Sequence, residues 1–174
     1  GLVGSEMCIR DSYKEGDMDQ VDRVLYDLKH NPASRRILTN IYVHQDLSEM
    51  ALYPCAYSMT FNVTGKKLNA ILNQRSQDML AANIWNVCQY SALVCMFAQV
   101  SGLEPGEFVH VIADAHIYDR HVPIVKELIE REPYDAPEFI MDKSIDDFYK
   151  FTKDSFSLKN YRYHEFTTKI PVAV

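Results

Sequence analysis

The sequence has no excess of basic residues. Its 174 residues carry 18 Lys and Arg against 24 Asp and Glu, which gives a net charge of −6. An acidic surface repels nucleic-acid backbones and anionic membranes, so general electrostatic binding to either is excluded. Any anion that the protein binds must therefore be held by a local group of arginines.

The sequence also lacks a long apolar run and closely paired cysteines. Polar residues interrupt its longest uncharged stretch, 80–103, which argues against a membrane span. No CxxC pair occurs among the four cysteines, and we expect no signal peptide. These features favour an intracellular, cytoplasmic protein with reduced thiols over a disulfide scaffold.

Length and composition indicate one folded domain. Hydrophobic residues make up 47% of the chain and charged residues 24%, which is typical of a globular protein. Residues 1–12 show no useful periodicity, and most of them resemble a translated sequencing adapter. We therefore expect residues 1–12 to be non-native, with no function for Cys8, and residues 13–174 to form the domain.

Hydrophobic periodicity predicts alternating helices and strands, and hence an α+β fold with a mixed sheet packed against helices. The helix at 83–100 is apolar nearly all round, which predicts burial on several sides. Strand 107–113 is mostly apolar, as a buried strand is, and Gly65 predicts a hairpin turn. The expected helices are 17–28, 83–100 and 122–131, and the expected strands are 37–43, 57–63, 68–72, 107–113 and 139–141.

One cysteine differs in its setting from the others. Cys55 follows Pro54, which restricts the backbone, and precedes an alternating strand. A nucleophilic thiolate needs a fixed backbone and a nearby cation, although a structural thiol is the simpler reading of Cys55 alone. Cys88 and Cys95 share one face of the apolar helix, where we expect them to pack.

A polar segment, residues 74–78 (QRSQD), stands between a strand and the long helix. This position suits anion binding, and a solvated loop is the alternative. His110, His116 and His121 are five and six residues apart. Helical metal ligands lie three or four residues apart, so we expect no metal site.

Several motifs together resemble the thymidylate synthase family. LYPCAY at 52–57 is similar to its active-site cysteine segment, and QRSQDM at 74–79 to its Gln-Arg-Ser-x-Asp signature. Asn86, DAHIY at 114–118 and KIPVAV at 169–174 follow in the family's order. The paired arginines Arg35 and Arg36 also fit, since Arg36 precedes Cys55 by nineteen residues, as in the family.

The resemblance implies reductive methylation of dUMP to dTMP with 5,10-methylenetetrahydrofolate as the co-substrate. Cys55 would add to C6 of uracil, and Asn86 would bind the uracil edge. The family's substrate-binding roles fall here on Arg35, Arg36, Arg75, Ser76, Asp78, Asn86, His116 and Tyr118, and its folate-binding roles on Asp78, Ala82, Trp85 and Ala173. Arg35 and Arg36 would reach the nucleotide phosphate of the other subunit of a homodimer.

For several of these residues a structural role is the alternative. Asp78 also suits the acidic position at a helix N-terminus, and Asn86 suits a packed or capping amide. His116 and Tyr118, two apart on an extended segment, would point the same way and bind the ribose, or else be ordinary buried side chains.

The sequence departs from the family at Ala56, where many members have His, and at Ala82, where many have Gly. Several front-half residues of the family also have no counterpart. We therefore interpret the sequence as a C-terminal portion that is inactive by itself. Other interpretations are a dUMP or dCMP hydroxymethylase, a non-catalytic nucleotide-binding remnant, and a redox or metal-binding cysteine protein.

Overall fold

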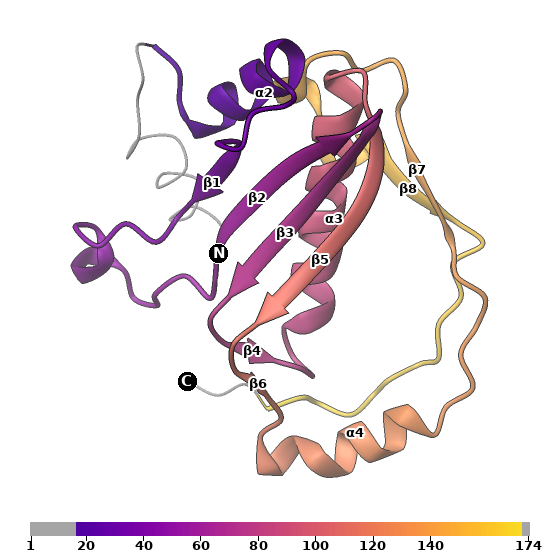
Figure 1. The fold of residues 1–174 in the computed structure, drawn as a ribbon. Helices are drawn as coiled ribbons and strands as arrows, with labels where there is room; N and C mark the ends of the chain where they lie inside the picture. Colours follow the sequence, from indigo (N-terminus) through magenta and orange to yellow (C-terminus); the bar gives the residue numbers. More distant parts are fainter. Residues whose placement is uncertain (1–16, 172–174) are drawn as a thin grey trace.

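The chain folds around a four-stranded sheet that carries a long helix on one face (Figure 1). The structure is a computed structural model, and it describes residues 17–171. The main sheet contains β1 (Leu38–Asn40), β2 (Ala56–Thr64), β3 (Lys67–Gln74) and β5 (Glu104–Ile112), and the helices are α2 (Gln20–His30), α3 (Asn83–Val100) and α4 (Val122–Ile129). The predicted α+β class is confirmed.

Two short strand pairs lie outside the main sheet. β4 (Gln77–Asp78) pairs with β6 (Ala115–His116), and β7 (Glu138–Met141) pairs with β8 (Phe156–Lys159). Between residues 17 and 171, the structure also has 3₁₀ turns at Leu47–Glu49, Asp119–His121, Phe148–Lys150 and Lys153–Ser155.

The order of the main sheet is β1-β2-β3-β5. β1, β2 and β3 are antiparallel, and Gly65, with φ +62°, makes the turn between β2 and β3. β3 and β5 are parallel and are joined through α3. β4 follows β3 and β6 follows β5, so the segments that leave these two strands meet at one end of the sheet (Figure 1).

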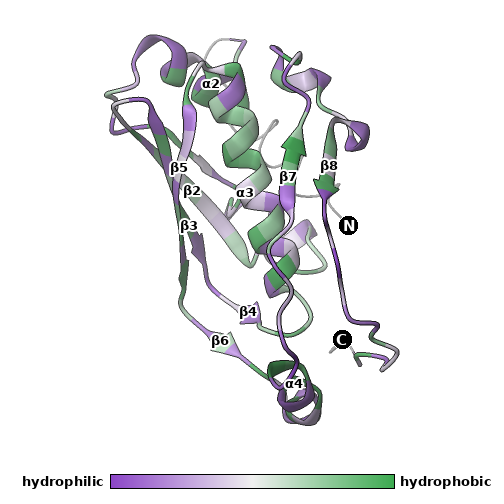
Figure 2. Ribbon diagram, turned by 90° about the vertical axis from the view of Figure 1, so that its right-hand side faces the viewer, coloured by the Kyte–Doolittle hydropathy of each residue, from purple (hydrophilic) through white to green (hydrophobic). Residues whose placement is uncertain are grey.

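The core lies between α3 and one face of the sheet. Met59 and Phe61 of β2 and Leu68 of β3 are at most 1% exposed, and the ring of Phe61 meets the ring of Phe97 edge-on at 5.3 Å. Viewed from the side, α3 and the β7/β8 pair lie on the same side of the sheet, and no helix or strand of residues 17–171 covers the opposite face (Figure 2). Within this part of the chain, the sheet is therefore packed on one face only.

Two burial predictions are wrong. α3 is buried only towards its C-terminal end, at Val94, Phe97, Ala98 and Val100, whereas Ile84 and Trp85 are 69% and 76% exposed. β5 lies at the edge of the sheet, and none of its residues is fully buried. An apolar composition alone therefore does not show whether a helix or strand is buried within the fold or has an exposed apolar face.

The predicted strand at 37–43 is shorter than expected, because only Leu38–Asn40 forms β1. Beyond each end of β1, one further backbone hydrogen bond joins the chain to β2. The amide of Phe61 donates to the Ile37 carbonyl, and the amide of Ile41 donates to the Tyr57 carbonyl. The predicted first helix is confirmed, and Asp19 caps it by accepting a hydrogen bond from the amide of Asp22.

Candidate functional site

Cys55 and Arg75 meet where β2 begins and β3 ends. The amide of Arg75 donates to the carbonyl of Cys55, which fixes the two segments side by side. The Arg75 guanidinium donates to the carbonyls of Pro54 and Tyr53, at 3.0 and 2.8 Å, and its Nη2 lies 3.8 Å from Sγ of Cys55. The hairpin of β2 and β3 therefore brings these two residues together.

The residues on either side of Arg75 are organised by buried amides. Gln74 is 2% exposed, and its Nε2 donates to the carbonyl of Ser76. Its Oε1 lies 2.8 Å from Nε2 of His110, so His110 carries its proton on that nitrogen, because an amide oxygen only accepts. Burial lowers the pKa of His110. Gln74 therefore fixes the loop that presents Arg75 and Ser76.

Asp78 lies where the polar segment turns towards α3. Its Oδ1 accepts hydrogen bonds from the amides of Leu80 and Ala81, both at 3.0 Å. These amides belong to the turn before α3, whose N-cap residue is Ala82, so Asp78 does not cap the helix itself. Within the described part of the chain, Oδ2 of Asp78 makes no hydrogen bond. One carboxylate oxygen thus orders the turn and the other is available to a ligand.

Asn86, on the first turns of α3, is joined to Gln77. Nδ2 of Asn86 donates to Oε1 of Gln77 at 3.0 Å, and Nε2 of Gln77 donates to the carbonyl of Asp78. Gln77 is 1% exposed. Sequence reasoning gave Gln77 no role, although its place within the 74–78 segment was a usable signal. The contact leaves Oδ1 and one N–H of Asn86 for a ligand.

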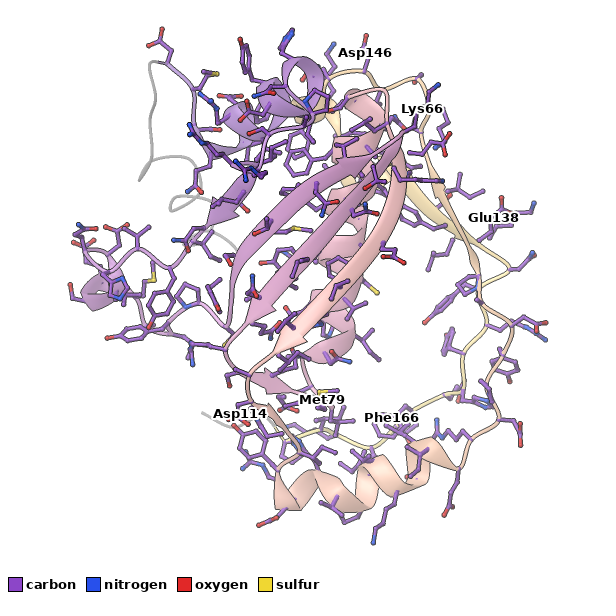
Figure 3. The ribbon with its side chains drawn as sticks, viewed as in Figure 1. Lys66, Met79, Asp114, Glu138, Asp146 and Phe166 are labelled. Carbon is purple, nitrogen blue, oxygen red and sulfur yellow. The ribbon has the colours of Figure 1, made fainter. Side chains whose placement is uncertain are left out.

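His116 and Tyr118 lie beside Asp78, because β6 pairs with β4 in the register that sets His116 opposite Asp78. The rings of His116 and Tyr118 meet edge-on at 5.1 Å, which confirms that the two side chains adjoin. Met79 and Asp114, which flank this pair of strands, lie at the same lower end of the molecule in Figure 3. His121, given no role by the sequence, also contacts Asp78, with Nδ1 3.7 Å from Oδ1.

The paired arginines lie away from this cluster. Arg35 and Arg36 are exposed and precede β1. The Ile37 carbonyl bonds to Phe61, which is six positions along the chain from Cys55. Six residues of strand span about 20 Å, so these arginines do not reach the Cys55 sulfur of their own chain.

The residues assigned to folate binding differ in their surroundings. Trp85 is 76% exposed, and Ala82 is the N-cap residue of α3, with no side-chain cap. Ala173 lies outside the described residues, and Pro171, which is described, passes beside His121. The exposed ring of Trp85 near Asn86 offers an apolar surface on the same end of the helix.

The other cysteines are unlike Cys55. Cys88 is exposed, so the prediction that it is buried is wrong, and Cys95 is half-buried. Burial raises the pKa of the Cys95 thiol, and the charge of Lys143 partly opposes this.

Among residues 17–171, no three His, Cys, Asp or Glu side chains gather as metal ligands do.

An open cavity of about 460 Å³ adjoins Arg75 on the uncovered face of the sheet. One leucine and several polar and aromatic side chains line it: Leu38, Asn40, Tyr42, His44, Tyr57, Ser58 and Arg75. Over residues 17–171, no helix is both long and apolar enough to cross a membrane.

Comparison with known proteins gives consistent matches over most of the chain. The family model described as thymidylate synthase matches residues 4–174. The chain is 44% identical over 146 residues to the thymidylate synthases of Bacillus phage phi3T and Bacillus atrophaeus, covering 84% of this chain and 52% and 64% of theirs.

A solved structure is similar over nearly the whole fold. The thermostable thymidylate synthase A from Bacillus subtilis superposes with a TM-score of 0.88 at 38% identity, covering 97% of this chain and 60% of that one. The chain thus spans about half to two thirds of the length of the proteins it matches.

Proposed function

The chain belongs to the thymidylate synthase family, and we propose that it is the nucleotide-binding and nucleophile-bearing portion of an enzyme that converts dUMP to dTMP. The observation that carries the proposal is the placement of the Arg75 guanidinium 3.8 Å from Sγ of Cys55. The thiolate is the form of cysteine that attacks carbon, and a cation at this position lies next to the sulfur that would react. The co-substrate is 5,10-methylenetetrahydrofolate.

In the proposed reaction, Sγ of Cys55 forms a bond to C6 of uracil, and the C5=C6 electron pair moves onto C5 and O4. C5 then attacks the methylene carbon of the folate. One carbon–nitrogen bond of the methylene bridge breaks during this attack, and loss of the C5 proton then expels the second folate nitrogen and leaves an exocyclic methylene group. A hydride from the released tetrahydrofolate adds to this group as the bond to Cys55 breaks, which gives dTMP and dihydrofolate. Asn86 stabilises the charge on O4 with its remaining N–H while its Oδ1 accepts from N3–H.

Arg75 and Ser76 bind the phosphate, and His116 and Tyr118 bind the ribose. Asp78 accepts from the pterin ring through Oδ2, and Trp85 packs on the folate together with Ala82 and the C-terminal residues. The surroundings of Asp78 support this assignment, because Oδ1 is occupied by the two amides while Oδ2 is not. Three described cysteines are unpaired, which suits the cytoplasm as the compartment.

The protein acts as a two-fold homodimer through the uncovered face of its sheet. Leu38, Thr60, Ile71 and Val109 stand opposite one another in a single row across four strands. Leu38, Ile71 and Val109 are 46%, 36% and 46% exposed, an apolar stripe that water leaves readily on association. A two-fold axis lying across the strands exchanges the two ends of the sheet, which brings Arg35 and Arg36 towards the partner's phosphate site.

The proposal is tested with a chimera, in which the part of the Bacillus subtilis enzyme that this chain does not cover precedes residues 13–174. A 5-fluoro analogue of dUMP, which cannot lose its C5 substituent as a proton, is incubated with the chimera and methylenetetrahydrofolate. We expect a covalent complex whose peptide map places the adduct on Cys55.

Two variants make the result specific. Cys55→Ser should form no adduct, because a hydroxyl is far harder to ionise than a thiol, and Cys88→Ser should form it normally. An adduct on Cys88 or Cys95, or dTMP formation by Cys55→Ser, would exclude the proposed mechanism. The 174-residue chain alone should form dihydrofolate at least about a hundredfold more slowly than the chimera, as expected when acid–base groups are missing.

A further inference from the structure

His121 is fully buried between Asp78 and the C-terminal segment. It has no exposed surface, and it stands at the N-terminus of α4. Its Nε2 lies 2.7 Å from the carbonyl oxygen of Pro171, fifty residues away in the sequence. Because a carbonyl oxygen only accepts hydrogen bonds, Nε2 carries the proton and donates it to Pro171.

The other ring nitrogen of His121 faces Asp78. Nδ1 lies 3.7 Å from Oδ1 and makes no hydrogen bond within the described residues. Asp78 cannot shift freely, because the same Oδ1 is held by the amides of Leu80 and Ala81. The ring of Tyr118, edge-on at 5.5 Å, closes another side of the imidazole.

Packing therefore leaves the imidazole little freedom. One edge rests against a carboxylate that is fixed by the turn before α3, and the opposite edge donates to the last described residue of the chain. Figure 1 shows the C-terminal segment, in yellow, returning between α4 and the β4/β6 pair. The side chain of His121 thus lies between two segments that are remote in sequence, one with Asp78 and one with Pro171, and contacts both.

We propose that His121 is a positioning residue, which sets the path of the C-terminal segment relative to Asp78. The consequence of this role rests on the proposed function, in which Asp78 accepts from the folate and the C-terminal segment covers it. His121 holds this carboxylate and this segment at a fixed spacing. His121 itself touches neither reacting atom. Its effect is to keep the C-terminal segment near the folate edge of the site before ligand binds.

The first test needs no ligand and uses the 174-residue chain. Gln places its amide nitrogen close to the Nε2 position of His, whereas Asn reaches only the Nδ1 position, so His121→Gln keeps the donor to Pro171 and His121→Asn loses it. Trypsin cleavage after Lys169, which is exposed, reports release of the segment. Cleavage after Lys143, in a turn of another region, serves as the internal reference.

We expect His121→Asn to accelerate cleavage after Lys169 about three- to tenfold, the change expected for one lost hydrogen bond when cleavage follows the open population. His121→Gln should stay within about twofold of the unchanged chain. His30→Asn, the same substitution at an exposed position on α2, should leave the rate unchanged. Equal rates for His121→Asn and the unchanged chain would overturn the proposal, as would acceleration by His121→Gln as large as by His121→Asn.

The second test uses the chimera and separates this inference from the proposed function. His121→Asn should raise the KM for methylenetetrahydrofolate about three- to tenfold and leave the KM for dUMP within twofold, and His121→Gln should restore the former. Equal increases in both KM values would refute the positioning role. If the chimera makes no dTMP at all, the proposed function fails, while the trypsin result still decides whether His121 holds the segment.

Discussion

The guanidinium of Arg75 holds the turn that presents the sulfur of Cys55. Nε and Nη2 of Arg75 donate to the carbonyls of residues 54 and 53, and Nη2 also approaches Sγ to 3.8 Å. The position of the cation beside the thiol is therefore fixed by the main chain of the same turn. One side chain both shapes the turn and supplies the charge.

Replacement of Arg75 by Gln should slow the alkylation of Cys55. The variant loses the cation beside the sulfur and the hydrogen bonds from the guanidinium to the turn, so the turn that presents the sulfur is less ordered. We expect the rate with iodoacetamide at pH 7 to fall by about tenfold, which corresponds to about 1.4 kcal/mol. Cys88, which is exposed, gives the reference rate in the same sample. An unchanged ratio of the two rates would separate Arg75 from the reactivity of Cys55.

Replacement of Asn86 by Asp should change base selection in the chimera. An ionised carboxylate only accepts hydrogen bonds, so it suits the amino group of cytosine and repels O4 of uracil. It also opposes Oε1 of Gln77, which now accepts from Asn86. We expect the turnover of dUMP to fall. The binding free energy of dCMP should become more favourable relative to that of dUMP by about 1–3 kcal/mol. The same preference in the variant would mean that Asn86 does not read the base, and hydroxymethyl products would favour the hydroxymethylase interpretation.

A charge on the uncovered face of the sheet should prevent dimer formation. Ile71 stands in the middle of the apolar row between Thr60 and Val109. Ile71→Asp would bury a carboxylate between two sheets, which is costly without a partner charge. Sedimentation velocity of the chimera should then show monomers, whereas Ile140→Asp, at a similarly exposed strand residue of β7, should sediment as the dimer. A dimeric Ile71→Asp would place the interface elsewhere.

The exchange of arginines between subunits can be tested by mixing two inactive chimeras. One carries Cys55→Ser, and the other carries Arg35→Ala with Arg36→Ala. In a mixed dimer one site combines an intact Cys55 with intact arginines from the partner, so random mixing should restore about a quarter of the sites. No recovery after mixing, with mixed dimers demonstrated by mass spectrometry, would show that the arginines do not act across the interface.

Stability should fall in acid through His110. Its pKa is lowered in the fold by burial, so the unfolded chain binds the proton first. The contribution of neutral His110 to the free energy of unfolding is fully present above about pH 6.5, the ordinary pKa of histidine. It is lost as the pH falls through the lower pKa that His110 has in the folded state. Urea unfolding of His110→Gln should therefore show a smaller loss of stability between pH 7.5 and 5.5 than the unchanged chain. His30→Gln, at an exposed histidine, provides the comparison.

The sequence by itself predicted most of the local elements and the family to which the chain belongs. Alternation at 57–63 and the turn at Gly65 predicted the hairpin, because side chains of a strand face opposite sides at every second residue. The motifs around Cys55, Arg75 and Asn86 indicated the family, because each belongs to a short segment whose residues are close in sequence. The order and spacing of these segments needed no knowledge of their packing.

Only the tertiary structure decided which surfaces are covered and which distant residues meet. Trp85 and Val109 are apolar yet exposed, because α3 and β5 each present one face to the core and one to solvent. Gln77 of β4 holds Asn86 of α3, and His121 contacts both Asp78 and Pro171. Such contacts leave no periodic pattern in the sequence, since they depend on how remote segments pack and not on the propensities of either segment.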